Sequence, residues 1–203
     1  MKVVGFAGFS NSGKTTLVEQ LIPLLRAHGL RVSVVKHAHH RFDIDQPGKD
    51  TWRHRTAGAF EVIASSDQRM ALMREYAEPA EPVVHELIAR LDAAVDWVLV
   101  EGFKESDLPK VEVWRAPSAD YPAHPVRYGS DPWIVAVAAD VPAAALPAPP
   151  DPLPVFDVRD PRALADWLRA TGDRWEYGRE GGRESGREGR TEGLADARSE
   201  ARA

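Results

Sequence analysis

The sequence has no cysteine among its 203 residues. Disulfides, zinc–cysteine sites, iron–sulfur clusters and a thiol nucleophile are therefore excluded. No stretch approaches the about 20 apolar residues that a membrane-spanning helix needs. The apolar start of the chain, residues 3–8, is too short for a signal peptide and has no cleavage-type end. We therefore expect a soluble, cytoplasmic protein without a membrane partner.

An excess of positive charge is also absent, because 26 lysines and arginines stand against 31 aspartates and glutamates. The resulting net charge of −5 argues against a general nucleic-acid-binding surface, which needs clustered cations. The apolar content of 43% is enough to build a core, so disorder throughout is excluded. The length suits one domain, or one domain with a tail.

Apolar residues become scarce near the C-terminus, where glycine, arginine and glutamate dominate residues 173–203. The last strong apolar anchors are Trp167 and Leu168, followed by Trp175 and Tyr177. A segment with so little apolar surface cannot offset the entropy lost when it becomes ordered. We predict a folded body over residues 1–172 and a disordered tail over residues 173–203.

Short apolar runs alternate with helical patterns in the predicted body. Continuous apolar runs are typical of strands buried on both faces, as in parallel α/β sheets. Two of the runs are too close in sequence for a helical crossover, so they are expected to pair antiparallel. The predicted strands are residues 2–7, 31–36, 60–64, 70–74, 96–101, 111–114, 133–138 and 155–158. The predicted helices are residues 14–28, 49–57, 82–91 and 161–170. The predicted fold class is α/β, a mostly parallel sheet flanked by helices with some antiparallel strands.

The segment Gly8–Thr16, GFSNSGKTT, fits the pattern G-x-x-x-x-G-K-[ST] between a predicted buried strand and a helix. In such a loop successive backbone N–H groups hold phosphate oxygens. The Lys14 ammonium can bridge the terminal phosphates, and the Thr15 hydroxyl can ligate Mg²⁺. These features predict a P-loop NTPase that binds a nucleoside triphosphate with Mg²⁺. The predicted nucleotide-binding residues are Asn11, Ser12, Gly13, Lys14, Thr15 and Thr16.

A triphosphate site also needs a carboxylate at the end of a neighbouring strand. Asp96 and Glu101 bracket one predicted strand. Ligands of parallel sheets bind at the carboxyl ends of the strands, which favours Glu101 over Asp96. We predict Glu101 as a ligand of the Mg²⁺ shell or as a catalytic group that orients the attacking water. The residues alone leave both roles open.

Polar residues follow the strand predicted at residues 31–36. His37, His39 and His40 lie within four positions and could ligate a transition metal, contact a phosphate-rich ligand or be solvated. Acidic residues come next, and they could complete the Mg²⁺ shell or form a switch segment ordered by the terminal phosphate. Among them, Asp45 is the predicted Mg²⁺ ligand.

Several motifs in this order resemble the family of the molybdopterin-guanine dinucleotide biosynthesis adaptor protein B (MobB). The resemblance covers about residues 1–170. The motifs are Gly8–Thr16, Lys36–His40, Pro47–Arg53, Ala57–Ala59, Val98–Lys104 and Pro109–Val113. The segments PGKD and VEGFK are the most specific of them.

The resemblance implies a GTP-binding P-loop protein related to nitrogenase iron protein and signal-recognition GTPases, working as a homodimer. It implies assistance to a partner guanylyltransferase, MobA-like, that joins GMP to molybdopterin, and molybdopterin as a further ligand. Guanylyl transfer then belongs to the partner, and the chain itself is expected to hydrolyse GTP slowly.

Guanine recognition is not visible as a motif, because the guanine-reading pattern Asn-Lys-x-Asp is absent from the sequence. The substitute we predict is Asp140, which follows the strand at residues 133–138 and could accept hydrogen bonds from guanine N1 and N2. Its alternative role is that of an acid in a turn. Guanine specificity is therefore an implication of the resemblance.

Two other functions remain open from the residues. The clustered histidines suit a nickel-delivery GTPase that acts as a metallochaperone, although the missing cysteines count against that role. A small-molecule kinase that uses ATP would share the P-loop, but it also needs a lid with arginines that we do not locate in the sequence.

Overall fold

The computed structural model describes residues 1–38 and 42–178. The chain forms two compact units, one made of Met1–His37 with the chain from Val84 onward, and one made of Ala38–Val83. Within the described ranges no helix is both long and apolar enough to cross a membrane. Most of the predicted tail, residues 179–203, lies outside the described residues.

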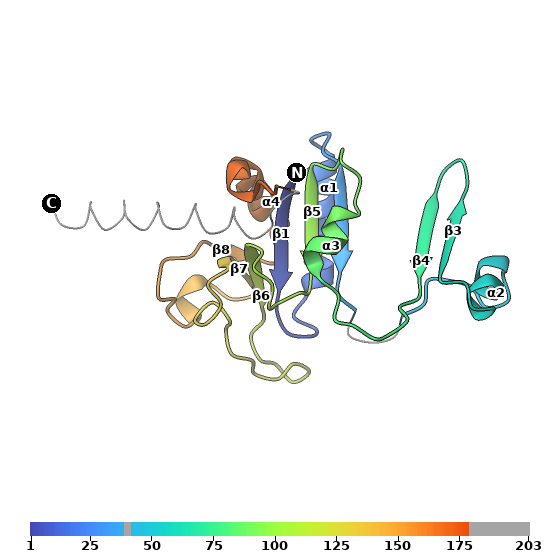
Figure 1. The fold of residues 1–203 in the computed structure, drawn as a ribbon. Coiled ribbons are helices and arrows are strands. Elements are labelled where there is room, and N and C mark those ends of the chain that lie inside the picture. The colour runs from blue at the N-terminus through green and yellow to red at the C-terminus, as the bar shows by residue number, and fades with distance from the viewer. Residues whose placement is uncertain (39–41, 179–203) are drawn as a thin grey trace. The chain divides into compact units, whose positions relative to one another are not determined.

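The first unit is built on a sheet of six strands in the order β2-β5-β1-β6-β7-β8 (Figure 1). Every neighbouring pair in this sheet is parallel. The strands are β1 Lys2–Ala7, β2 Val32–Lys36, β5 Trp97–Glu101, β6 Lys110–Trp114, β7 Ile134–Ala139 and β8 Val155–Asp157. The predicted α/β class is confirmed.

Helices cover both faces of this sheet. Alternate residues of the central strands point to opposite sides and so belong to two separate cores. Val4 of β1 belongs to a core shared with α1 (Lys14–Arg26) and α4 (Pro161–Ala170). Its neighbour Val3 belongs to a second core, which includes Ile88 of α3 (Val84–Ala89). β5 is buried along its whole length. Burial on both faces explains the continuous apolar runs of the sequence.

The packed chain continues past residue 172. A 3-10 helix, Gly172–Trp175, places Trp175 in the α1/α4 core with 2% of its surface exposed. Glu176 then forms a β-bridge with Lys2, and the Tyr177 N–H donates to the Met1 carbonyl at 2.9 Å. Trp175 and Tyr177 are therefore packed against the first unit, although both lie beyond the boundary predicted at residue 172.

The second unit contains α2 (Asp50–Thr56), β3 (Glu61–Ser65) and β4 (Met70–Arg74). β3 and β4 pair antiparallel, as predicted. They form a two-stranded sheet of their own, whereas the sequence suggested strands mixed into the main sheet. Sequence proximity determines that the two strands pair but does not determine which sheet they join.

Candidate functional site

The loop between β1 and α1 has the backbone that a phosphate-binding loop needs. Gly8, Asn11 and Gly13 all have positive φ angles. A Cβ on Gly8 would lie 2.4 Å from the Val113 carbonyl oxygen, so only glycine fits there. α1 begins directly after Gly13, and no side chain among the described residues caps it. The first amide groups of α1 are thus available to an anion, which the positive end of the helix dipole attracts.

Lys14 reaches across the loop. Its ammonium donates to the carbonyl oxygens of Gly8 and Phe9 at 3.0 and 2.6 Å. Burial lowers the pKa of Lys14, while the nearby Glu101 carboxylate raises it. A bound polyphosphate would stabilise the charged form of this lysine, as any adjacent anion does. The role of Lys14 at a terminal phosphate stays a prediction.

Glu101 meets the loop at the carboxyl end of β5. Its Oε1 atom accepts a hydrogen bond from the Thr15 hydroxyl at 2.6 Å. The same oxygen lies 2.5 Å from the Lys36 ammonium, which is also 3.3 Å from the Thr15 hydroxyl. By contrast, Asp96 lies at the other end of β5 and accepts from the Arg31 N–H at 2.7 Å. The structure thus brings Glu101 and Thr15 together and keeps Asp96 apart.

This pair of oxygens fits the Mg²⁺ ion that the loop implies. Hydroxyl and carboxylate oxygens are hard donors of the kind Mg²⁺ prefers, usually with several waters retained. Thr15 and Glu101 would hold the ion, which would neutralise phosphate charge. The third predicted ligand, Asp45, lies in the other unit. There it accepts from the Thr51 hydroxyl at 2.7 Å and from Arg55 at 3.1 Å. Its place in the Mg²⁺ shell stays a prediction.

The segment after Glu101 contacts His37. Gly102 has a φ of +89°, and a Cβ there would lie 2.8 Å from the His37 Cβ. The His37 ring stacks on Phe103 at 4.6 Å between centroids. In the described residues no group of three His, Cys, Asp or Glu side chains is placed to hold a metal ion. The predictions for His39 and His40 lie outside the described residues.

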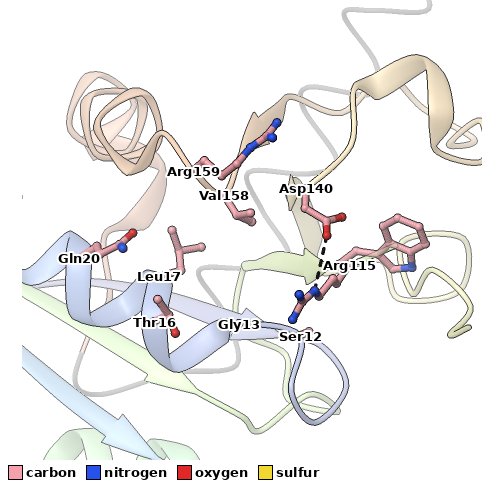
Figure 2. A pocket seen from close by; sticks show the side chains of 10 residues that line it. Ser12, Gly13, Thr16, Leu17, Gln20, Arg115, Asp140, Val158 and Arg159 are labelled. Carbon is pink, nitrogen blue, oxygen red and sulfur yellow. Dashed lines mark ion pairs between the residues drawn. The ribbon is translucent and has the colours of Figure 1, made fainter. Parts of the chain in front are cut away.

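A pocket of about 530 Å³ opens beside the loop. Its lining residues are Ser12, Gly13, Thr16, Leu17, Gln20, Trp114, Arg115, Asp140, Val158 and Arg159 (Figure 2). The pocket thus joins the phosphate loop to the carboxyl ends of β6, β7 and β8. It includes the predicted base contact, Asp140, and three of the predicted loop residues.

The polar groups of this pocket are partly engaged. Asp140 accepts from the Ala116 N–H at 2.8 Å and pairs with the Arg115 guanidinium at 3.6 Å (Figure 2). The Ser12 hydroxyl is buried and has no hydrogen-bond partner within the described part of the chain. A buried hydroxyl without a partner is costly, so a ligand oxygen that accepts a hydrogen bond from it would be favourable.

No role was predicted for Lys36, Arg115 or Arg159. Lys36 is the last residue of β2 and lies opposite Glu101 in the parallel register. The available signal was that both residues end predicted parallel strands, and such strands end at the same edge of a sheet. The sequence did not indicate that the two strands are neighbours. Arg159 follows β8, and the Asp157 carboxylate holds its guanidinium at 2.7 to 3.1 Å.

A parallel sheet with a P-loop after its first strand, and a carboxylate facing the loop threonine, defines the class of P-loop NTPase folds. The family within this class follows from comparison with known proteins. The family described as "Molybdopterin guanine dinucleotide synthesis protein B", MobB, matches residues 3–140, and the chain belongs to that family.

Individual relatives agree with this assignment. The chain is 39% identical over 167 residues to the molybdopterin-guanine dinucleotide biosynthesis adapter protein of Escherichia coli, covering 82% of this chain and 90% of that protein. It is 46% identical over 114 residues to the Haemophilus influenzae protein of the same name, covering 56% of this chain and 63% of that one. A crystal structure of a MobB homologue from Bacillus stearothermophilus matches with a TM-score of 0.57 at 27% identity, covering 84% of this chain and 97% of that chain.

Proposed function

We propose that this chain is a cytoplasmic, GTP-binding adapter in molybdopterin-guanine dinucleotide biosynthesis, assisting a partner guanylyltransferase. The observation that carries the proposal is the Thr15–Glu101 oxygen pair beside the P-loop, in a chain that belongs to the MobB family. The helix that follows this loop, α1, has amide groups at its start that no described side chain caps. The names of the relatives supply the adapter role. Family membership favours this function over a nickel chaperone or a small-molecule kinase.

The phosphate end of the ligand would bind at the loop. The α1 amides and the Lys14 ammonium would hold phosphate oxygens, and Thr15 with Glu101 would hold Mg²⁺. Glu101 Oε1 is already shared by a hydroxyl and an ammonium donor. The contact with the Thr15 hydroxyl places Glu101 beside the other oxygen that the loop offers to Mg²⁺, which supports its metal-shell role. We expect this chain to hydrolyse GTP slowly, as the family resemblance implies, with guanylyl transfer left to the partner.

The base would occupy the pocket beside the loop. Asp140 lines this pocket, and the Ala116 N–H fixes one of its carboxylate oxygens. A carboxylate accepts the two donors on the guanine N1 and N2 edge, whereas adenine presents an acceptor at N1. This difference supports GTP as the preferred nucleotide and gives Asp140 the role that the missing motif would otherwise play.

Calorimetry with GTP and ATP, each with and without Mg²⁺, tests the proposal. We expect GTP to bind more tightly than ATP, with Mg²⁺ strengthening the binding. Asp140→Asn should reduce the preference for GTP over ATP and leave the effect of Mg²⁺ on affinity in place. Glu101→Gln should reduce the effect of Mg²⁺ and leave the preference for GTP in place. Preference for ATP in the unchanged protein would contradict the guanine assignment and favour the kinase.

A homodimer is the second part of the proposal, and the second unit offers a surface for it. Ile63 of β3 lies opposite Leu72 of β4, so both side chains are on one face of the two-stranded sheet. They are 64% and 44% exposed, and Met70 on the same face is 69% exposed. Exposed apolar patches of this kind mark interaction sites. A second copy of this chain would cover the face.

Sedimentation equilibrium of charge-introducing variants tests the dimer. Ile63→Lys together with Leu72→Lys should shift the mass from dimer to monomer, because two buried charges oppose association. Val34→Lys is the matched control, since Val34 is an exposed apolar residue of β2 in the first unit, 41% exposed. Dissociation by the control variant alone would place the interface on β2 instead.

A further inference from the structure

The oxygen pair formed by Thr15 and Glu101 already has a cation beside it. The Lys36 ammonium lies 2.5 Å from Glu101 Oε1 and 3.3 Å from the Thr15 hydroxyl. One ammonium thus contacts both oxygens that a metal ion would need. The two oxygens are themselves 2.6 Å apart, so a cation bound to one of them is necessarily near the other.

The two partners of this ion pair differ in exposure. The Glu101 side chain is 9% exposed, whereas the Lys36 side chain is 52% exposed. The carboxylate is therefore fixed in the sheet edge, while the lysine can leave it for solvent at low cost. Water can solvate the charge of a half-exposed lysine once it leaves its partner, which lowers the cost of leaving. The ion pair is built so that the cation can be exchanged and the carboxylate stays.

Charge near the loop makes such an exchange sensitive to occupancy. Lys36 and Lys104 both repel Lys14, and Glu101 is the carboxylate whose charge acts on Lys14. A second cation at Glu101 would add to this repulsion unless the Lys36 ammonium moved away. Phosphate oxygens at the loop offer a new partner for the displaced ammonium. Metal ion and lysine therefore compete for Glu101, and polyphosphate relieves the competition.

We propose that Lys36 is the internal counter-cation of the Thr15–Glu101 pair and competes with a divalent cation for it. This inference rests on the proposed function only in taking that pair as the metal site. Lys36 is the last residue of β2, and the second unit begins two residues later at Ala38. The Lys36 ammonium therefore has to leave the Thr15–Glu101 pair before a divalent cation can bind there.

A purely structural ion pair makes a different prediction from a competing one. If Lys36 only stabilised the sheet edge, its removal would lower the free energy of unfolding and leave metal affinity unchanged or weaker. If Lys36 competes, its removal leaves Glu101 without a counter-charge and increases metal affinity. The direction of the change in metal affinity decides between the two roles.

The test measures Mn²⁺ binding to the full, nucleotide-free chain by electron paramagnetic resonance. Lys36→Met keeps the length of the side chain and removes its charge, so Mn²⁺ should bind about tenfold more tightly. Lys104→Met is the matched control, because it removes another cation that repels Lys14. Its Mn²⁺ affinity should stay within about twofold of the unchanged protein, since Lys104 is exposed and solvent-screened charges act weakly. Glu101→Gln should abolish the gain in the Lys36→Met background.

Equal or weaker Mn²⁺ binding by Lys36→Met overturns the proposal, and so does undetectable binding by both proteins. Urea unfolding shows whether the variant is folded, and Lys36→Gln provides a second uncharged side chain if it is not. GTP affinity is measured separately by calorimetry. If the unchanged protein did not bind GTP, the proposed function would be overturned. The comparison of Mn²⁺ binding without nucleotide would still decide the role of Lys36.

Discussion

Gly8 allows the phosphate loop to pass directly against β6. A Cβ there would lie 2.4 Å from the Val113 carbonyl oxygen and 2.8 Å from the Ser12 hydroxyl. Gly8→Ala should therefore displace the loop and lower the free energy of unfolding by about 1–3 kcal/mol. GTP affinity should fall with it, because the amides would no longer converge. Urea unfolding and calorimetry measure the two effects.

Gly129→Ala is the control for this change, because no described residue has an atom within 4 Å of a Cβ at that glycine and its φ is not positive. It should leave both quantities nearly unchanged. A Gly8→Ala variant as stable as the control would show that the loop can adopt another path.

Lys14 is the residue on which nucleotide affinity depends most directly. Its ammonium lies at the loop carbonyls, where a charge-assisted hydrogen bond to phosphate would form. Lys14→Ala should weaken GTP binding about 10- to 100-fold. Arg26→Ala, an exposed cation at the other end of α1, should not change it. If the Lys14 variant bound GTP as tightly as the unchanged protein by calorimetry, the phosphate site would lie elsewhere.

At the scale of elements, Arg55 of α2 ties together the loop that precedes the helix and the end of β4. Its guanidinium pairs with Asp43, Asp45 and Glu75 at 2.8, 3.1 and 2.7 Å. A backbone N–H from Asp45 and the Arg55 side chain lower the pKa of Asp43. The Thr51 hydroxyl and Arg55 lower that of Asp45. A single arginine thus holds the predicted switch segment to its own unit.

These lowered pKa values predict how the second unit responds to acid. A carboxyl whose folded pKa lies below its unfolded value stabilises the fold above the unfolded pKa. This stability is lost as the pH falls through the folded pKa. Carboxyl-carbon NMR titration should give pKa values below 3.8 for Asp43 and Asp45. Arg55→Met should raise both, and unchanged values in that variant would show that Arg55 does not hold them.

The elements themselves were largely predictable from the sequence. β1 and the buried β5 gave continuous apolar runs, and their predicted limits agree with the structure to within one residue. α1 ends at Arg26, two residues before its predicted end, since helix ends are weakly encoded. Sheet membership was not predictable for β3 and β4, because a short hairpin pairs with itself in either sheet. The sequence also did not predict that Lys110 and Glu112 of β6 are buried, each with 1% of its surface exposed.

On the scale of the whole molecule, the C-terminal residues complete the first unit. Trp175 lies against Trp97 of β5 and donates from its indole N–H to the Thr171 hydroxyl at 3.1 Å. The free energy of unfolding of a chain ending at residue 172 should therefore be about 3–5 kcal/mol lower than that of a chain ending at residue 178. Urea unfolding of the two truncated proteins measures the difference. Equal stability would show that the aromatic contacts contribute little.

The chain ending at residue 178 also tests the predicted tail. Its free energy of unfolding should equal that of the full chain if residues 179–203 contribute no packed surface. A loss of stability on this truncation would contradict the prediction of a disordered tail.

The sequence by itself determined the phosphate loop, the order and type of the elements and the family. A loop of nine residues and a buried strand are encoded by contiguous residues, so their backbone geometry follows from local rules. The tertiary structure alone decided that Lys36 contacts Glu101, that β3 and β4 form a sheet of their own, and that Trp175 packs in the core. The contacts of Lys36 and of Trp175 join segments far apart in the chain. They depend on the strand order β2-β5-β1 and on side-chain packing, which no local pattern records.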